Sequence, residues 1–439
     1  MITYLSGIAL EKVDDRRTTA KKVIVGLSFA FNLSILFFYK YANFAVDILN
    51  KVLIGVRMQC EEIPHFNVLL PVGISFFTFQ ALSYTMDVYR DETKAEKNFL
   101  RYALYVSFFP QLVAGPIERS KTLLKQLSET SRFEFNKARD GLLLMLWGYF
   151  LKIVIADRIG VVVDTVYSEC QLYNGWYLIV ATILFAFQIY CDFAGYSTIA
   201  IGAAEILGIK LMENFDAPYT AQTVSEFWRR WHISLTSWFR DYLYIPLGGN
   251  RKGRFRRGVN ILTVFLVSGL WHGAGLHYVA WGGINGIFQI IGDSMIPFKH
   301  KIIRILKLNP MSLGFKLYKA IVTFVLIDLS WVYFRAESFS KANAIVKSVF
   351  TANNPWILFD GSLYNLGLNE KNFHVMLGGI LLLIISDLLK RKGICIREII
   401  AEQDYIFRWV FISTVVIMLL IFGIWGSNYA ASGFIYFQF

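Results

Sequence analysis

Charged residues are scarce in this sequence. Only 17% of its 439 residues are Asp, Glu, Lys or Arg, whereas 55% are hydrophobic. Soluble domains have about 25% charged and about 45–50% apolar residues, so the composition excludes a soluble protein and predicts a polytopic membrane protein. Spans of ~20 residues each account for the length as one membrane unit. We therefore expect an all-α fold with a single domain over residues 1–439.

Cysteines and familiar catalytic motifs are also lacking. The four cysteines show no metal-ligand spacing and imply neither a zinc site nor a disulfide framework. The chain has no GxxxxGK[ST] loop and no GxSxG motif, which leaves nucleotide hydrolysis and serine-triad chemistry unsupported. His272 and His277 have no cysteine or carboxylate beside them, so we predict no metal and no bound cofactor.

A signal-peptide pattern is missing from the N-terminus, so membrane insertion is expected to depend on internal spans. The net charge is +12, but the Lys and Arg residues cluster in short loops between apolar segments. Cytoplasmic loops beside an anionic leaflet have this distribution. We therefore expect the chain's partner to be a lipid bilayer and not a nucleic acid.

Long apolar segments recur along the chain. Pro71, Pro110 and Pro116 interrupt two of them, and broken helices at membrane depth are tolerated where they pack in protein or line a cavity. The charged stretch Glu118–Asp140 is predicted to be a surface helix. The apolar segments are Val23–Tyr39, Asn67–Tyr89, Leu100–Ile117, Gly141–Val163, Trp176–Tyr190, Leu317–Phe334, Val375–Leu389 and Ile406–Trp425.

Charged side chains occur within these apolar segments. Lys152 and Asp157 should lie near an interface or face the bundle, and Asp192 lies among glycines and other small residues that permit close helix packing. A carboxylate inside a membrane is a functional candidate by default. An equally simple interpretation is that Asp192 pairs locally.

An amphipathic element precedes the basic loop GGNRKGRFRRG. Thr223 and Glu226 fit a capping box, and aromatic residues recur at helical spacing up to Tyr244, before Pro246. A Trp-rich helix with basic residues, too polar to span, is predicted to lie at the membrane interface over Thr223–Tyr244. The basic loop after it should be cytoplasmic.

Two apolar pieces, Val259–Leu270 and Leu276–Ile291, are joined by WHGAG. At 1.5 Å per residue they reach roughly 18 and 24 Å, short of the ~30 Å hydrocarbon core. Basic residues flank both sides, which favours an even number of crossings. We predict a hairpin whose corner contains His272.

Histidine is the side chain best suited to take a proton from a hydroxyl near neutral pH. His272 is the best candidate, because the neighbouring glycines permit close approach and Trp271 supplies an apolar wall. A histidine in such a corner also commonly serves as a helix-packing hydrogen-bond donor. His232 lies between Trp231 and Ile233, where ordinary interfacial anchoring would explain it.

The segments EFWRRWHISLTSWFRDYLYIPLGGNRKG and GLWHGAGLHYVAWGGINGIF closely resemble the membrane-bound O-acyltransferase family, specifically its alginate O-acetyltransferase-like branch. The resemblance includes LPVGISFFTFQALSYTMDVYR, FFPQLVAGPIER, YCDFAGYSTIAIGAAEILGI and the tail GFIYFQF. It implies a ring of tilted helices around a thinned centre, with a tunnel between a cytoplasmic acyl donor and an acceptor outside. It also implies that His272 is catalytic and that His232 is a second functional position. Relatives of this branch usually carry additional apolar segments before the equivalent of Met1–Lys22, so an N-terminally short form is expected.

The resemblance implies O-acetylation of a cell-envelope polysaccharide of alginate or peptidoglycan type in a bacterial cytoplasmic membrane. The expected donor is acetyl-CoA, whose phosphates Arg251–Arg257 could attract, although the positive-inside rule explains these residues more simply. An extracytoplasmic acetyltransferase is the expected partner. D-alanyl transfer to teichoic acid is a near alternative, and a membrane transporter is an alternative of another class.

The tail GFIYFQF places Tyr436 near the C-terminus. An aromatic tail is most simply an interface anchor. A phenol of pKa ~10 is also a far better leaving group than a sugar hydroxyl, so an acetyl-tyrosine would retain enough reactivity for a second transfer. The tail further resembles the C-terminal motif of the small partner peptide in teichoic-acid D-alanylation. We therefore hypothesise that Tyr436 accepts the acetyl group and passes it to the extracytoplasmic partner.

Overall fold

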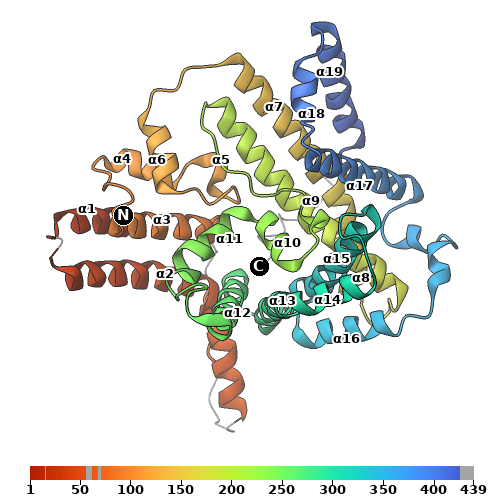
Figure 1. The fold of residues 1–439 in the computed structure, drawn as a ribbon, viewed down its shortest axis with the longest axis horizontal. Coiled ribbons are helices and arrows are strands. Elements are labelled where there is room, and N and C mark those ends of the chain that lie inside the picture. Colours follow the sequence, from red (N-terminus) through yellow and green to blue (C-terminus); the bar gives the residue numbers. More distant parts are fainter. Residues whose placement is uncertain (15, 56–61, 68–70, 426–439) are drawn as a thin grey trace.

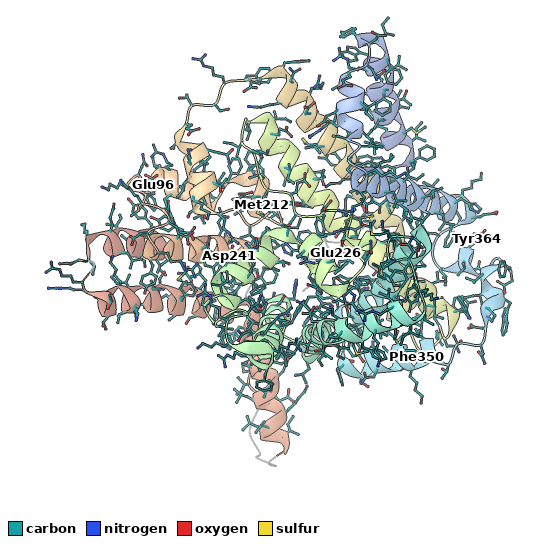
Figure 2. All side chains as sticks on the ribbon, viewed as in Figure 1. Glu96, Met212, Glu226, Asp241, Phe350 and Tyr364 are labelled. Atoms are coloured by element: carbon teal, nitrogen blue, oxygen red, sulfur yellow. The ribbon has the colours of Figure 1, made fainter. Side chains whose placement is uncertain are left out.

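A computed structural model describes residues 1–14, 16–55, 62–67 and 71–425, and helices make up its regular structure. No β-strand occurs in these ranges, so the predicted all-α class is confirmed. Figure 1 shows longer helices arranged around a centre occupied by α10 (Val224–Arg230) and α11 (Ile233–Phe239). In Figure 2 the side chains of Glu226 and Asp241 lie near this centre, whereas Phe350 and Tyr364 lie at the periphery.

The first third of the chain forms one side of the ring. α2 has 38 residues, so it is roughly 57 Å long and exceeds the thickness of the hydrocarbon core. The predicted interruption of Leu100–Ile117 is confirmed: Ser107 and Phe108 separate two short helices of 8 and 4 residues, and Pro110 lies in the first turn of the second. The helices here are α1 (Ile2–Lys12), α2 (Thr18–Gly55), α3 (Ile74–Tyr89), α4 (Phe99–Val106), α5 (Phe109–Leu112) and α6 (Ser120–Ser128).

Glycines bring the next two long helices into close contact. A Cβ on Gly141 would lie 2.5 Å from the Gly202 carbonyl oxygen, and one on Gly148 would lie 2.6 Å from that of Gly195. The small residues around Asp192 therefore permit close helix approach, as predicted. The helices in this part are α7 (Phe135–Tyr149), the π-helix η1 (Phe150–Ala156), α8 (Asp157–Ser168) and α9 (Trp176–Ile206).

The π-helix η1 explains the charged residues inside these segments. In a π-helix residues five apart share a face, and the Lys152 Nζ lies 2.8 Å from an Asp157 carboxylate oxygen. The same ammonium lies 2.6 Å from an Asp192 oxygen on α9. Both carboxylates are almost fully buried. Asp192 therefore pairs locally, which is the simpler of the two interpretations offered by the sequence.

The predicted interfacial helix Thr223–Tyr244 is wrong in two respects. It is divided into α10, α11 and the π-helix η3 (Arg240–Tyr244), with a break at Trp231 and His232. It is also buried, since the side chains at Phe227, Trp231, Leu235 and Trp238 are at most 6% exposed. The aromatic stripe contacts the protein interior instead of headgroups. The Thr223 cap is confirmed, because its hydroxyl accepts from the Glu226 N–H at 3.0 Å.

The predicted hairpin is present, but its helices are longer than the apolar pieces. α12 (Gly253–His272) begins inside the basic loop, and α13 (Leu276–Ser294) extends past the apolar run. With 20 and 19 residues they reach roughly 30 and 28 Å, so the expectation of two short pieces was wrong. A Cβ on Gly282 would clash with the Phe265 carbonyl, so this glycine lets the helices pack closely.

The C-terminal third completes the ring. Five helices of the described ranges are long and apolar enough to cross a membrane: α2, α9, α15, α17 and α19. Most of the apolar stretch of α9 is buried (78%), against 6% for α19, so α9 is central and α19 is peripheral. The remaining elements are the 3₁₀ turns η2 (Pro218–Thr220), η4 (Pro355–Leu358) and η5 (Ser362–Asn365), and the helices α14 (Ile296–Ile305), α15 (Leu313–Arg335), α16 (Phe339–Phe350), α17 (Glu370–Arg391), α18 (Ile396–Ala401) and α19 (Tyr405–Phe422).

Candidate active site

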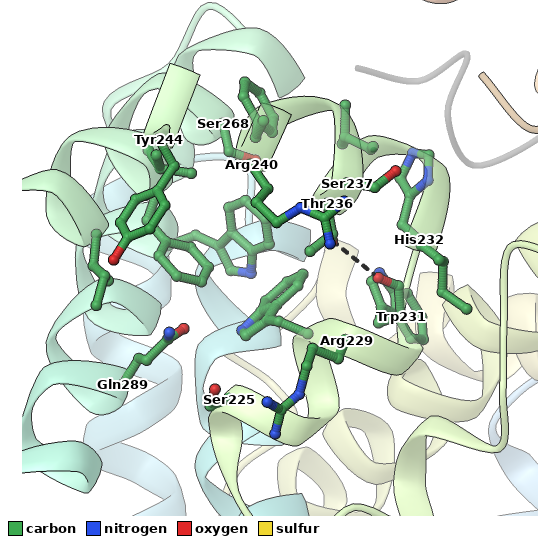
Figure 3. A pocket seen from close by; sticks show the side chains of 18 of the residues that line it. Ser225, Arg229, Trp231, His232, Thr236, Ser237, Arg240, Tyr244, Ser268 and Gln289 are labelled. Carbon is green, nitrogen blue, oxygen red and sulfur yellow. Dashed lines mark hydrogen bonds between the residues drawn. The ribbon is translucent and has the colours of Figure 1, made fainter. Parts of the chain in front are cut away.

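A cavity of about 380 Å³ lies at the centre of the ring, and both His232 and His272 line it. Its walls come from α10, α11, η3, α12, α13 and α15, so segments more than 100 residues apart enclose one space. Figure 3 shows His232, Trp231 and Thr236 at one side of it, and Tyr244 and Gln289 at another. The structure therefore brings together the two histidines that the sequence singled out.

His232 is the N-cap of α11 and has a left-handed backbone conformation, with φ of 45°. This conformation is unfavourable for a residue with a Cβ and persists where the surrounding structure enforces it. The enforcing contacts come from Asn214: the Ile233 N–H donates to its backbone oxygen at 3.0 Å, and the Ser234 N–H donates to its Oδ1 at 3.2 Å. The sharp turn lets a buried imidazole point away from the axis of α11.

The hydrogen bonds of Asn214 determine the tautomer of His232. The Asn214 Oδ1 must be an oxygen because it accepts from the Ser234 N–H, and it also lies 2.9 Å from the Ser234 hydroxyl. The His232 Nδ1 lies 3.1 Å from the same oxygen, so Nδ1 carries a proton and donates. In the neutral ring, Nε2 is then the atom with a lone pair. Nothing in the sequence pattern indicated this role for Asn214.

His272 is the last residue of α12, and its side chain is 5% exposed. Aromatic rings surround it: the ring centroids of Trp271, Trp281 and Phe334 lie 4.8, 5.1 and 5.2 Å away. The centroid of Trp271 also lies 6.4 Å from that of His232. The surroundings of His272 are therefore apolar and exclude most of the solvent.

Lys40 of α2 holds the corner next to His272. Its ammonium donates to the Trp271 carbonyl oxygen at 2.7 Å, which satisfies one of the carbonyls left without an intrahelical partner at the end of α12. A cation at a helix C-terminus also interacts favourably with the helix dipole. In the sequence, Lys40 only follows the apolar segment Val23–Tyr39, and nothing local connects it to a corner 231 residues away.

Arginines line another part of the cavity. Arg229, Arg240 and Arg257 contribute to its wall. Arg240 forms an ion pair with Asp241 at 2.8 Å and Arg257 with Asp293 at 2.5 Å, whereas Arg229 has no ion-pair partner in the described part of the chain. Guanidinium groups bind phosphate and carboxylate oxygens well, so this part of the cavity favours an anionic ligand group.

The glycine-rich loop forms a second cavity of about 330 Å³ beside the first, and the two share Arg240, Tyr244 and Asn250. Gly248 and Gly249 have φ of 108° and 53°, and residues with side chains rarely adopt such values. The two glycines are therefore required by the tight turn that brings Asn250 to the Tyr244 hydroxyl.

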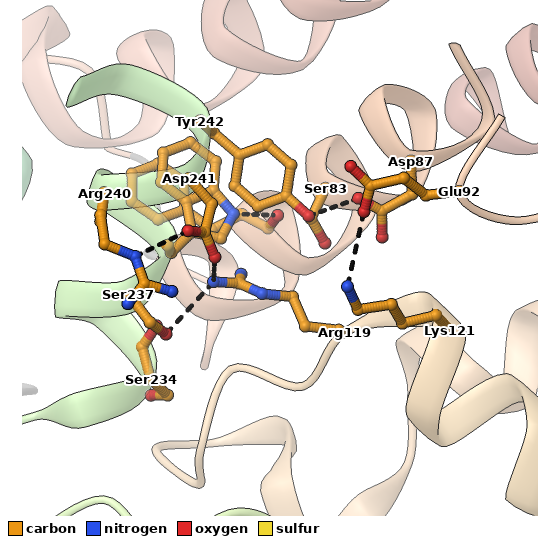
Figure 4. A network of polar contacts seen from close by, with 12 residues as sticks. Ser83, Asp87, Glu92, Arg119, Lys121, Ser234, Ser237, Arg240, Asp241 and Tyr242 are labelled. Atoms are coloured by element: carbon orange, nitrogen blue, oxygen red, sulfur yellow. Dashed lines mark hydrogen bonds and ion pairs between the residues drawn. The ribbon is translucent and has the colours of Figure 1, made fainter. Parts of the chain in front are cut away.

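A polar network attaches η3 to the N-terminal helices (Figure 4). The buried carboxylate of Asp87 accepts from the Ser120 hydroxyl at 2.6 Å and from the Tyr242 hydroxyl at 2.5 Å. The Arg119 guanidinium lies over the Tyr242 ring at 4.9 Å and forms an ion pair with Asp241 at 3.3 Å. These contacts position the π-helix that supplies Arg240 and Tyr244. In the sequence, these segments are distinguished only by their resemblance to the family.

Comparison with known families identifies the chain. The family model of the membrane-bound O-acyltransferases matches residues 72–303, slightly more than half of the sequence. The chain belongs to the membrane-bound O-acyltransferase family. Both histidines lie within the matched segment. The resemblance recognised from the motifs is thereby confirmed.

Three relatives place the chain within this family. A probable alginate O-acetylase of Pseudomonas aeruginosa is 36% identical over 80% of this chain, and one of Pseudomonas putida is 38% identical over 79%. A peptidoglycan O-acetyltransferase of Helicobacter pylori is 32% identical over 80%. The alignments cover 64%, 68% and 69% of these relatives, so the chain spans about two thirds of their length.

Other predicted site features remain predictions. Tyr436 lies outside the described residues, so its role in acetyl transfer is untested. Within the described ranges, no three His, Cys, Asp or Glu side chains form a group that could hold a metal ion. His277 contacts the Tyr333 carbonyl through Nδ1 at 3.2 Å, which gives it a structural role at the hairpin corner.

Proposed function

We propose that this membrane-bound O-acyltransferase family member transfers acetyl groups to hydroxyls of a cell-envelope or exported polysaccharide. The donor is acetyl-CoA, the location is a bacterial cytoplasmic membrane, and an extracytoplasmic acetyltransferase is the partner. One observation carries the proposal: His232 and His272 line a single cavity that also has an arginine-lined part. The names of the relatives support the acetyl group and the polysaccharide class.

The chemistry follows from the arrangement. An acceptor hydroxyl attacks the thioester carbonyl carbon while His272 takes the hydroxyl proton as general base. The tetrahedral intermediate collapses, the carbon–sulfur bond breaks, and the leaving thiolate receives the proton from His272. The aromatic rings around His272 keep water from competing for the thioester. His232, whose orientation is set by Asn214, positions the reacting group.

The arginines support a phosphate-bearing donor. Coenzyme A carries several phosphate charges, and Arg229 has no carboxylate partner to compete with them within the described ranges. A carrier protein with a phosphopantetheine arm, as expected for D-alanyl transfer, would present a single phosphodiester. Arg229→Gln should therefore raise the KM for acetyl-CoA about 10- to 100-fold and leave kcat within about twofold, since a hydrogen bond to a charged group contributes ~1.5–3 kcal/mol.

The test uses the purified protein in liposomes with labelled acetyl-CoA, the extracytoplasmic partner and a polysaccharide acceptor. We expect label in the acceptor with the unaltered protein and at least ~10²-fold less with His272→Ala. His300→Ala is the control, because His300 is exposed on α14 and does not line the cavity. Label transfer that survives His272→Ala would refute the catalytic role. A requirement for a D-alanyl carrier protein would instead support the alternative substrate.

A further inference from the structure

The indole of Trp281 has a buried hydrogen-bond donor that the fold does not use. The side chain is 1% exposed, and its Nε1 has no hydrogen-bond partner among the residues that the structure describes. The indole N–H groups of Trp271 and Trp331 share this property, but Trp271 does not line the cavity and no ring contact among the described residues joins Trp331 to His272. In contrast, Trp228 donates to the Asn285 Oδ1 at 3.3 Å, and Trp238 donates to the Phe79 carbonyl at 3.0 Å. Buried N–H groups nearly always have an acceptor, so an unused donor in a cavity wall indicates a ligand atom.

Trp281 lies where such an atom would react. It lines the same cavity as His272, and the two rings meet edge to face with centroids 5.1 Å apart. The helix around it is firmly held, because the Asn285 side chain donates to the Trp281 carbonyl at 2.9 Å and Gly282 packs against α12. The indole also packs against Trp331, with centroids 5.8 Å apart. The Trp281 indole N–H and the His272 imidazole therefore lie on the two helices of one closely packed hairpin.

We propose that the Trp281 indole N–H binds the carbonyl oxygen of the acyl group and stabilises the oxyanion that forms on it. This inference rests on the proposed acyl transfer. When the acceptor oxygen bonds to the carbonyl carbon and His272 takes its proton, the carbonyl electron pair moves to oxygen. When the carbon–sulfur bond breaks, the pair returns. A preorganised donor in an apolar cavity is most effective at the stage when charge develops.

The aromatic packing of Trp281 would exist without any catalytic role, so the test must separate the N–H from the ring. Trp281→Phe removes the donor and keeps an aromatic ring. Replacement of Trp281 by benzothienylalanine is sharper, because sulfur replaces the N–H in a bicyclic ring of nearly the same shape. Trp238→Phe is the matched control, since it removes an indole N–H that is satisfied within the fold and lies outside the cavity wall.

The measurement is kcat and KM for acetyl transfer by the full chain in liposomes, together with thermal unfolding. Both Trp281 variants should lower kcat about 10²-fold, the effect typical of losing one oxyanion donor, with KM within about twofold. Trp238→Phe should lower thermal stability and leave kcat within about twofold. A benzothienylalanine variant that folds and retains its kcat would overturn the proposal. Inactivity of the unaltered protein would instead refute the proposed function.

Discussion

Replacement of Asn214 by alanine tests how His232 is positioned. The Asn214 Oδ1 lies within hydrogen-bond distance of three donors: the His232 Nδ1–H, the Ser234 N–H and the Ser234 hydroxyl. All three residues are at most 2% exposed, so water does not readily replace the lost acceptor. The variant Asn214→Ala therefore removes the shared acceptor of these buried donors and weakens the constraint on the imidazole.

The two effects differ in size. A buried donor that loses its partner costs about 1–3 kcal/mol, so the His232 Nδ1–H and the Ser234 N–H together cost ~2–6 kcal/mol of stability. That is a large share of the ~5–15 kcal/mol typical of a folded protein. The hydrogen bond from Asn214 contributes ~0.5–1.5 kcal/mol to the orientation of the imidazole, which corresponds to a loss of about two- to tenfold in turnover. Stability should thus suffer more than turnover.

The assay measures thermal unfolding in detergent and acetyl transfer per folded molecule. Ser234→Ala is the matched control, because it removes one of the three donors and keeps the contact between His232 and Asn214. It should lower stability by less than ~1 kcal/mol, since no donor is left without a partner, and keep turnover within about twofold. If Asn214→Ala unfolds at the wild-type temperature and retains full turnover, the tautomer assigned to His232 is wrong.

Three further predictions concern pH, packing and the tail. Burial raises the pKa of Glu118 to about 7, so protonation favours the folded state; stability should fall as pH rises from about 4.5 to 7. In the Glu118→Gln variant, the melting temperature should change less between pH 4.5 and 7 than in the unaltered protein. The same dependence on pH in both proteins would refute the argument. Gly282→Ala should destabilise the hairpin by ~1–3 kcal/mol, because its Cβ would clash with α12. Gly292 lies on the same helix with open space around it, so Gly292→Ala should leave the stability unchanged. Equal melting temperatures of the two variants would contradict the close packing at Gly282. Tyr436→Phe keeps an aromatic tail and should abolish polysaccharide acetylation if its hydroxyl carries the acetyl group; unchanged acetylation would leave anchoring as its only role.

Much of the fold could be predicted from the sequence because membrane constraints are local. A segment in lipid must satisfy its backbone hydrogen bonds within itself, so apolar length alone identifies helices such as α9 and α17. Helix boundaries were less predictable. α12 continues into the basic loop because backbone hydrogen bonding does not stop where hydrophobicity does. The interruption of Leu100–Ile117 could be predicted from Pro110, because proline is tolerated in the first turn of a helix but not in its interior.

The sequence by itself determined that this is an all-α membrane protein with a glycine-flanked histidine corner, and its motifs indicated the family. Those features are local, since they depend on residues adjacent in the chain. Only the tertiary structure decided the surroundings of His232. The aromatic periodicity of Thr223–Tyr244 is the same for an interfacial helix and for a buried, broken one. The segments that pack against the helix decide between these two arrangements. The residues that contact His232, His272 or the adjacent Trp271 come from other segments, which the linear pattern does not connect: Asn214, Trp281 and Lys40.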